Sequence, residues 1–283
     1  MDAYLRRIGA ERPGHANATA LRELQERHLR SVPFENLAVH LGEGIVLDEK
    51  RLVDKIVSAG RGGICYELNG AFAALLRDLG FRVQLLQARV FGEDGTLGIP
   101  YDHLALLVGT EDGAGRWLAD VGFGDHSHHP LAFDLREDQH DPAGTFRIVP
   151  AGGRGAAGDA DGHGDLDVLR DGKPQFRLET RPRVLADFRA GAWWHSTSPD
   201  SHFTRSLVCS RLTADGRTTL SGRRLVTTLG GERHEEILHG DPAVFAAYRD
   251  HFGIRLDRLP ADPRAGEDRR SDQGDGGEES DGD

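Results

Sequence analysis

Apolar residues in the first 80 positions recur at helical spacing. Residues 19–31 place two leucines and a histidine on one helical face between arginine and glutamate positions. Residues 48–58 open with an aspartate, which is a common helix cap, and stop before a glycine. The clearest helix covers residues 65–79, where six apolar positions repeat at i, i+3, i+4, i+7, i+8 and i+11 before Gly80. This part of the chain is therefore predicted to be helical.

The pattern changes at residue 81, where short runs rich in Val, Leu and aromatic residues replace the helical spacing. The first three runs are bounded by Gly, Asp or Pro, as strands are. The predicted strands of this part cover residues 82–91, 103–108, 117–121, 146–149, 166–170 and 175–179. A Gly/Ala/Asp tract at 151–165 has no apolar periodicity, which predicts a long flexible hairpin loop.

The last third of the chain mixes both patterns. Helices are predicted over residues 185–196, 235–239 and 242–252, and a strand meander over 205–212, 218–221 and 224–228. After Pro260 the composition turns to Asp, Glu, Gly and Ser, which predicts disorder.

Composition and charge exclude several classes of protein. The 283 residues are 38% apolar, enough to bury a sizeable core, and no apolar run approaches the ~20 residues that span a bilayer. The net charge is −11, of which residues 261–283 contribute −6, so nucleic acid is not an expected partner. The N-terminus shows no apolar stretch typical of a signal peptide. Two cysteines cannot build a disulfide framework, which favours a cytoplasmic location. No pattern predicts an oligomeric state.

Candidate chemistry is concentrated first in the segment Arg61-Gly-Gly-Ile-Cys-Tyr-Glu-Leu-Asn69. Its two glycines lead directly into the strongest predicted helix, with Cys65 in the first turn. Backbone N–H groups and the helix dipole there favour a thiolate, the nucleophilic form of cysteine. A cysteine on a helix is more commonly a small buried apolar residue, and we interpret Cys209 that way. Packing alone needs neither the glycines nor the polar neighbours of Cys65, so Cys65 is the candidate nucleophile.

Two further segments supply an imidazole and a carboxylate. His103 opens an apolar strand, so it can face a cleft while the strand anchors in the core. Asp120 interrupts an apolar run just before a Gly-Phe-Gly turn, where burial requires a partner such as an imidazole N–H. Each signal has an ordinary structural explanation, a core histidine or an Asp that caps turn amides. Together with Cys65 they form a Cys/His/Asp set that matches thiol-based triad chemistry.

These segments resemble the motifs of the arylamine N-acetyltransferase family. RGGICYELN is similar to the family's RGGxCxExN signature, and His103 and Asp120 stand where the family has its other two catalytic residues. VPFENL at 32–37 and STSPDSHF at 196–203 also resemble family segments. The resemblance runs from about residue 1 to about residue 255, and excludes the Gly-rich loop and the acidic tail.

The resemblance implies an α+β fold in three parts around a cysteine-protease-like core. A helical domain (1–80) would carry the cysteine, and a β-barrel domain (81–184) the histidine and aspartate. A helical interdomain segment (185–204) would lead to an α/β lid (205–260), followed by the disordered tail (261–283). The helix and strand pattern of the chain agrees with this order.

The resemblance also implies the transfer of an acetyl group to xenobiotic amines in two steps. Cys65 would attack acetyl-CoA, CoA would leave, and an arylamine, arylhydrazine or N-arylhydroxylamine would take the acetyl group. His103 would carry the proton and Asp120 would orient it. Phe34, Phe123 and Phe203 lie in the three motifs expected to meet at the cysteine, so we expect them to line an aromatic acceptor pocket. Each could equally be a core residue.

Other residues of the motifs are expected to be structural. Arg61 and Glu35 are interpreted as a buried charge pair beside the site. Tyr66 and the Trp193-Trp194 pair are interpreted as core or lid packing. The loop after Gly124 departs from the family in Asp125, which would not favour an anionic donor.

That loop also carries His126, His128 and His129. Three histidines in four residues raise a metal site as an alternative, but a polar loop near the CoA entrance is favoured, with no metal.

Three other functions remain open at this point. A cysteine hydrolase would use the same three side chains on peptides or amides. An amide synthase would share the fold but take its acyl group from a carrier-bound chain. A non-catalytic binding module would not need three separated triad members. The RGGICYELN and VPFENL motifs favour the acetyltransferase.

Overall fold

The N-terminal part of the chain packs as helices around α5 (Cys65–Asp78). The structure is a computed structural model that describes residues 1–113, 115–152 and 164–264. The other helices of this part are α1 (Asp2–Ile8), α2 (Ala18–Ser31), α3 (Leu37–His40) and α4 (Glu49–Val57). The three helices predicted here are confirmed to within about one residue at each end. Asn17 and Asp48 cap α2 and α4 by accepting backbone N–H groups.

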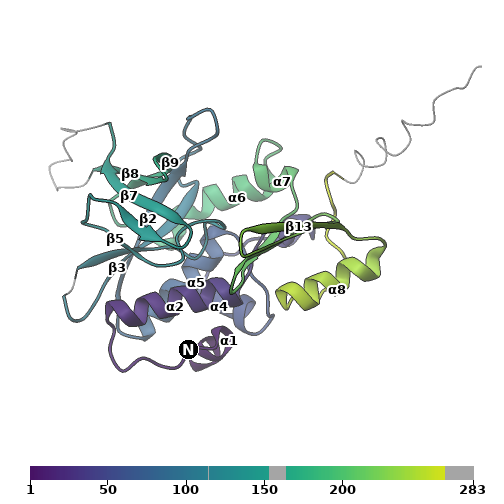
Figure 1. Cartoon of the computed structure of the whole chain (residues 1–283), viewed down its shortest axis with the longest axis horizontal. Coiled ribbons are helices and arrows are strands. Elements are labelled where there is room, and N and C mark those ends of the chain that lie inside the picture. The colour runs from purple at the N-terminus through teal and green to yellow at the C-terminus, as the bar shows by residue number, and fades with distance from the viewer. Residues whose placement is uncertain (114, 153–163, 265–283) are drawn as a thin grey trace, which may run out of the picture.

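The middle of the chain forms an eight-stranded antiparallel sheet that curls into a nearly closed barrel (Figure 1). Its spatial order is β5-β4-β3-β2-β9-β8-β7-β6. The strands are β2 (Arg82–Val90), β3 (His103–Gly109), β4 (Arg116–Ala119), β5 (Leu131–Ala132), β6 (Gln139–Asp141), β7 (Gly144–Pro150), β8 (Asp165–Arg170) and β9 (Lys173–Glu179). The side chain of Gln139 joins the two edge strands, because its amide both donates to and accepts from the backbone of Ala132.

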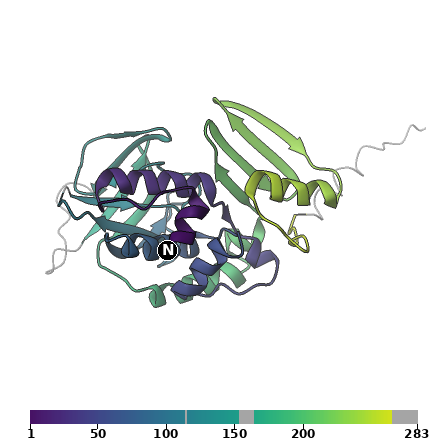
Figure 2. The same ribbon diagram turned by 90° about the horizontal axis from the view of Figure 1, so that it is seen from below.

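A second sheet and a helix form the C-terminal part, which stands to one side of the helices and the barrel (Figure 2). The chain reaches it through η1, a 3₁₀ helix (Leu185–Phe188), α6 (Arg189–Thr197) and α7 (His202–Arg205). The sheet has the order β1-β10-β11-β12-β13 and is packed against α8 (Asp241–Phe252). Its strands are β1 (Phe34–Glu35), β10 (Cys209–Leu212), β11 (Gly216–Ser221), β12 (Arg224–Leu229) and β13 (Glu232–Ile237).

Two predictions in the C-terminal part were wrong. Residues 235–239 are not helical, since β13 pairs antiparallel with β12 and all six of its residues are exposed. The two strands are joined at Gly230 and Gly231, both of positive φ, which is typical of a tight hairpin. The strand predicted from residue 205 starts only at β10, because Ser201 caps the short helix α7 through the N–H of Phe203.

The first strand of this second sheet comes from the N-terminal part of the chain. β1 pairs with β10, with Phe34 opposite Ser210. A segment of the VPFENL motif is therefore built into the C-terminal sheet, about 175 residues away in sequence. This pairing fixes the C-terminal part against the N-terminal part, whose helix α5 carries Cys65.

The predicted flexible loop at 151–165 lies for the most part outside the described residues, as does the predicted disordered tail from residue 265 on.

Candidate active site

Cys65 is the first residue of α5 and is buried. The chain reaches it through Gly62, where an added Cβ would lie only 1.9 Å from the carbonyl oxygen of Pro33. The carboxylate of Glu67 accepts the N–H of Ile64 at 3.1 Å and so caps the helix. These contacts place the sulfur at the positive end of the helix dipole, which stabilises a thiolate.

His103 and Asp120 form a short, buried hydrogen bond. The distance from Nε2 of His103 to Oδ2 of Asp120 is 2.6 Å. Because an ionised carboxylate can only accept, Nε2 carries the hydrogen and donates it. Nδ1 is then the ring nitrogen left for Cys65, which lines the same cavity as His103 and interacts electrostatically with its imidazole. The sequence predicted that Asp120 interrupts a strand over residues 117–121. In the structure, Asp120 instead follows the last residue of β4.

This pairing holds a charge inside the protein. Burial alone would lower the pKa of His103, but the Asp120 carboxylate and the Cys65 sulfur raise that pKa to about 10. Burial raises the pKa of Asp120, and the imidazole overcomes this and lowers it. An imidazolium and a carboxylate therefore face each other at neutral pH, with the sulfur beside them.

Two amide side chains complete the anchoring of Asp120: Asn69, the last residue of the RGGICYELN motif, to which the sequence assigned no role, and Gln25, which the sequence did not single out. Asn69 donates from Nδ2 to Oδ1 of Asp120 at 2.8 Å and accepts the N–H of Val121 at 2.9 Å. Gln25 accepts the N–H of Asp120 at 3.3 Å. Gln25 is fully buried. Its position four residues after Leu21, on the apolar face of α2, is the sequence signal that would have revealed it.

The turn after Asp120 packs closely against the backbone of Cys65. A Cβ added at Gly122 would lie 2.7 Å from the Cα of Cys65 and 2.8 Å from Nδ2 of Asn69. Gly122 also donates its N–H to Oδ1 of Asp120 at 2.8 Å. Only a residue without a side chain lets the barrel approach α5 this closely.

We therefore expect Gly122→Ala to destabilise the protein by about 1–3 kcal/mol, the usual cost of overpacking. The extra carbon displaces Cys65 or Asn69, so alkylation of the Cys65 thiol should slow as well. Thermal unfolding and thiol alkylation rates measure the two effects. Gly14→Ala, at an exposed bend with open space around it and without a positive φ, controls for the loss of a glycine. A Gly122→Ala protein with wild-type stability and reactivity would show that the close contact does not matter.

A cavity of about 510 Å³ opens above Cys65 and His103. The three phenylalanines predicted for the acceptor pocket all line it: Phe34, Phe123 and Phe203. The ring of Phe123 meets that of His103 edge-on with centroids 5.2 Å apart, and the rings of Phe34 and Phe203 are 5.9 Å apart. The structure thus brings together residues from the N-terminal helices, the barrel and the interdomain helices.

The cavity wall also holds a second carboxylate–imidazole pair that the sequence did not reveal. Nε2 of His195 lies 3.0 Å from Oδ1 of Asp102. The carbonyl oxygen of Asp102 accepts from the hydroxyl of Tyr66 at 3.1 Å and lies 3.9 Å from the sulfur of Cys65. The residue before His103 is therefore held from both α5 and α6.

The residues interpreted as structural include one that the structure places differently. Nε of Arg61 lies 2.9 Å from Oε1 of Glu35, and both side chains are buried. Tyr66 is completely buried, as expected. Trp193 was predicted to pack in the core or lid, but it is 67% exposed because its side of α6 faces solvent.

The histidine loop is more buried than its polar sequence suggests. His126 packs against Phe123, Phe146 and Phe176, and burial lowers its pKa to about 4. His129 instead pairs with Asp141, with 3.0 Å between Nδ1 and Oδ2. Within the described ranges, no three His, Cys, Asp or Glu side chains come together as a metal site requires.

Cys209 lies in the core of the C-terminal part, fully buried on β10. Burial raises the pKa of its thiol, so the sulfur remains protonated and unreactive. In residues 1–113, 115–152 and 164–264, no helix is both long and apolar enough to cross a bilayer.

Known proteins are similar to this chain in both sequence and fold. A family model described as N-acetyltransferase matches residues 17–260. The arylamine N-acetyltransferase of Mycolicibacterium smegmatis is 32% identical over 92% of this chain and 93% of its own length. The solved arylamine N-acetyltransferase of Salmonella typhimurium superposes with a TM-score of 0.80 and 30% identity, covering 91% of this chain and 92% of that one. The enzyme of Mycobacterium marinum, solved in complex with CoA, gives a TM-score of 0.76 and 31% identity, over 89% and 92% of the two chains.

Proposed function

This chain belongs to the arylamine N-acetyltransferase family, and from this we propose that it acetylates aromatic amines from acetyl-CoA in two steps through an acetyl group on Cys65. The proposed acceptors are arylamines, arylhydrazines and N-arylhydroxylamines. One observation carries the proposal: Cys65 and the His103–Asp120 pair meet at one wall of a cavity large enough for a small aromatic molecule.

In the first step, the thiolate of Cys65 attacks the carbonyl carbon of the thioester. A bond forms between that carbon and Sγ, and the bond from the carbon to the sulfur of CoA breaks. CoA leaves as a thiolate. The first N–H groups of α5 have no partner within the helix, so they can stabilise the negative charge on the carbonyl oxygen.

In the second step, the amine nitrogen attacks the acetyl carbon and the sulfur of Cys65 leaves. A proton must move from the nitrogen to a base, and His103 is the base beside the sulfur. The free Cys65 sulfur helps raise the pKa of His103. Acetylation removes that contribution, so the neutral imidazole becomes more available in the acyl-enzyme than in the free enzyme.

We propose that the walls of the acceptor pocket are aromatic. Replacing Phe123 or Phe203 by leucine removes a flat ring face worth roughly 1 kcal/mol against an arylamine. The KM for the amine should therefore rise about fivefold, with a smaller effect on acylation by acetyl-CoA.

Steady-state kinetics with several amines and single-turnover acylation separate the two half-reactions. Phe133→Leu is a matched control, because Phe133 is buried in the barrel core and does not line the cavity. Equal effects on both half-reactions, or loss of stability alone, would favour a core role for Phe123 and Phe203.

The test of the activity itself is a thiol assay. Incubation with acetyl-CoA and 4-anisidine or isoniazid should release CoA and form the N-acetyl product in equal amounts. Product formed without acetyl-CoA, or CoA release that does not depend on the amine after the first turnover, would contradict the proposed transfer.

We also propose the division into a helical domain, a barrel domain, an interdomain helix and a lid, and a cytoplasmic location. The second and third clusters of buried apolar residues support the division, because one lies within the barrel and the other lies mostly within the C-terminal part. The first cluster joins the N-terminal helices to the barrel strands β2, β3 and β4. Two cysteines without a disulfide are compatible with a reducing compartment.

A further inference from the structure

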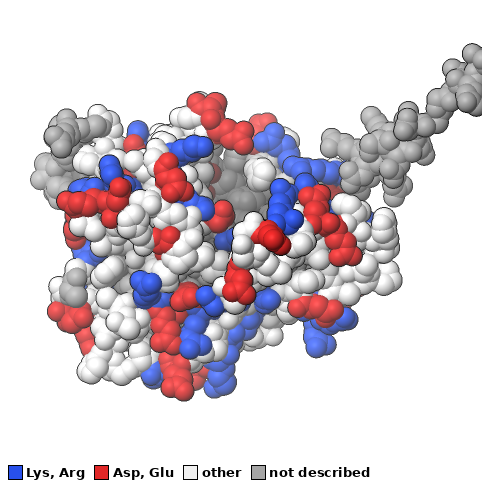
Figure 3. All heavy atoms as spheres, in the orientation of Figure 1, with Lys and Arg blue, Asp and Glu red and all other residues white. Residues whose placement is uncertain are grey.

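The charges at the far side of the reaction cavity have no role in the steps above. Asp125 and Arg217 line the same cavity as Cys65. In the space-filling view, acidic and basic side chains stand beside the hollow that opens between the barrel and the C-terminal sheet (Figure 3). The sequence alone placed an acidic residue here, in a position unfavourable for an anionic donor.

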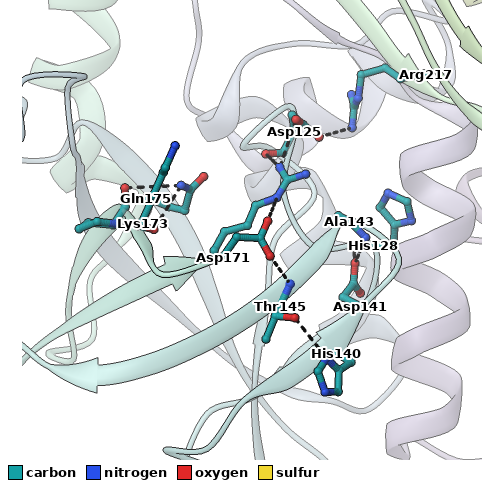
Figure 4. A network of polar contacts seen from close by, with 12 residues as sticks. Asp125, His128, His140, Asp141, Ala143, Thr145, Asp171, Lys173, Gln175 and Arg217 are labelled. Atoms are coloured by element: carbon teal, nitrogen blue, oxygen red, sulfur yellow. Dashed lines mark hydrogen bonds and ion pairs between the residues drawn. The ribbon is translucent and has the colours of Figure 1, made fainter. Parts of the chain in front are cut away.

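The structure shows that this carboxylate lies between two guanidinium groups. Nη1 of Arg170 is 3.1 Å from Oδ2 of Asp125, and Nη2 of Arg217 is 3.6 Å from Oδ1. Arg170 ends β8 of the barrel and Arg217 lies on β11 of the second sheet, so Asp125 spans the opening between them (Figure 4). The local charge is therefore not acidic, contrary to what Asp125 alone implied.

The remaining contacts of Arg170 and Arg217 do not fully compensate their two positive charges. Arg217 also donates to the hydroxyl of Ser210 at 3.2 Å, which is a neutral partner. The other carboxylate near Arg170 is Asp171, 3.9 Å from Nε and already accepting the N–H of Thr145. Burial lowers the pKa of Arg217, and the positive charge of Arg170 lowers it further against the opposing effect of Asp125. The two guanidiniums thus repel each other across a single shared carboxylate.

The exposure of the three side chains is unequal. The side chain of Asp125 is 64% exposed, whereas those of Arg170 and Arg217 are 23% and 20% exposed. The arginines are held in place, and the carboxylate can turn away into solvent. A phosphate carries more charge than a carboxylate and accepts guanidinium hydrogen bonds in the same paired geometry.

We propose that Asp125 is an internal counter-ion that a phosphate group of the acyl donor displaces, so that Arg170 and Arg217 bind that phosphate. The inference rests on the proposed function, since it assigns the phosphate to a thioester donor whose other end reaches Cys65. An arylamine acceptor has no such group. Until the donor binds, the carboxylate of Asp125 offsets the electrostatic repulsion between the guanidinium groups of Arg170 and Arg217.

The proposal is tested by comparing two acetyl donors at constant ionic strength, each with the same arylamine as the acceptor. Acetyl-CoA carries phosphates, whereas p-nitrophenyl acetate carries none. Arg217→Gln should raise the KM for acetyl-CoA about tenfold more than the KM for p-nitrophenyl acetate, since a charge-assisted contact is lost. Asp125→Asn should instead lower the KM for acetyl-CoA severalfold, because the competing carboxylate is removed. In the double variant Asp125→Asn/Arg217→Gln this gain should be lost.

Inorganic pyrophosphate gives a readout that does not need acetyl-CoA turnover. It should slow the burst of p-nitrophenolate that accompanies acetylation of Cys65 by p-nitrophenyl acetate, more strongly in Asp125→Asn and more weakly in Arg217→Gln than in the wild type. The exposed pair Arg116–Asp134 is remote from the cavity, so Arg116→Gln and Asp134→Asn should leave both donors and the inhibition unaltered. Circular dichroism and thermal unfolding confirm that each variant is folded.

The outcomes separate the counter-ion exchange at Asp125 from the proposed use of acetyl-CoA as the donor. Equal changes for both donors, or unchanged pyrophosphate inhibition in folded Arg217→Gln, would overturn the counter-ion exchange. If wild-type protein is acetylated by p-nitrophenyl acetate with pyrophosphate inhibition that depends on Arg217 but does not use acetyl-CoA, the anion site stands and the proposed donor is wrong.

Discussion

Replacing Cys65 by alanine should abolish the release of CoA that acetyl-CoA alone produces from the wild-type protein. With one nucleophile per chain, the wild type should release about one equivalent of CoA in a burst and then stop until an amine is added. The acyl-enzyme accumulates because the sulfur is buried and water has limited access to it. Peptide mapping should find the acetyl group on Cys65 and not on Cys209, whose thiol stays protonated.

Serine at the same position should be as inactive as alanine in this burst. Its hydroxyl remains protonated beside His103, so the shape of the site is kept while the nucleophile is lost. Turnover with an arylamine should fall by about 10³-fold or more in both variants. Cys209→Ser is the matched control and should retain the burst. An alanine variant that still acetylates an arylamine from acetyl-CoA would act through a direct complex of both substrates, and the covalent mechanism would be wrong.

Replacing Asp120 by asparagine should lower the rate of acetylation by about 10³–10⁴-fold, as the loss of an orienting carboxylate does in comparable triads. Oδ1 of Asp120 accepts from both Asn69 and Gly122, so the amide oxygen of the new side chain must take this place. The NH₂ group then points at Nε2 of His103, which can only accept from it. The ring hydrogen then moves to Nδ1. A protonated Nδ1 has no free lone pair, so the imidazole can no longer take a proton from Cys65.

The thiol should lose its reactivity along with the burst. Iodoacetamide alkylation of Cys65 at pH 7 measures the thiolate directly and should be much slower in Asp120→Asn. Asp138→Asn, which removes an exposed carboxylate from the same barrel, is the control. Fast alkylation in Asp120→Asn would mean that the carboxylate does not set the state of His103.

The same variant should change how stability depends on pH. The pKa of His103 is about 10 in the folded protein, above the ordinary value of ~6.5. The ion pair therefore stabilises the fold fully below pH ~6.5, and the stabilisation is lost as the pH rises toward 10. The lowered pKa of Asp120 sets the other limit, since its contribution disappears only in acid. Urea unfolding should show the largest gap between wild type and Asp120→Asn near pH 6 and a shrinking gap up to pH 10.

Local sequence patterns determined which segments are helices and strands in most of the chain. The helix that begins at Cys65 is predictable because its apolar spacing and its flanking glycines act within a few residues. The two barrel strands that hold His103 and precede Asp120 are predictable for the same reason. The charge pair of Arg61 and Glu35 also follows from sequence, because a buried charge needs a partner and both lie in recognisable motifs.

Contacts between distant residues were decided only by the tertiary structure. Asn69 and Gln25 reach Asp120 across 51 and 95 positions, and no local pattern encodes such a distance. The pairing of β1 with β10 is of the same kind. The helix predicted over residues 235–239 failed because charged, exposed residues show no helical or strand periodicity, and pairing with β12 decides their conformation.

The role of Asp125 shows the difference most clearly. Its sequence position predicts an acidic group at the mouth of the cavity, but its two arginine partners come from β8 and β11, 45 and 92 residues further along the chain. Sequence determined which charges exist, since that depends on covalent chemistry alone. Packing of the two sheets determined which charges meet, because electrostatic interactions depend on distance and burial, which exist only in the folded chain.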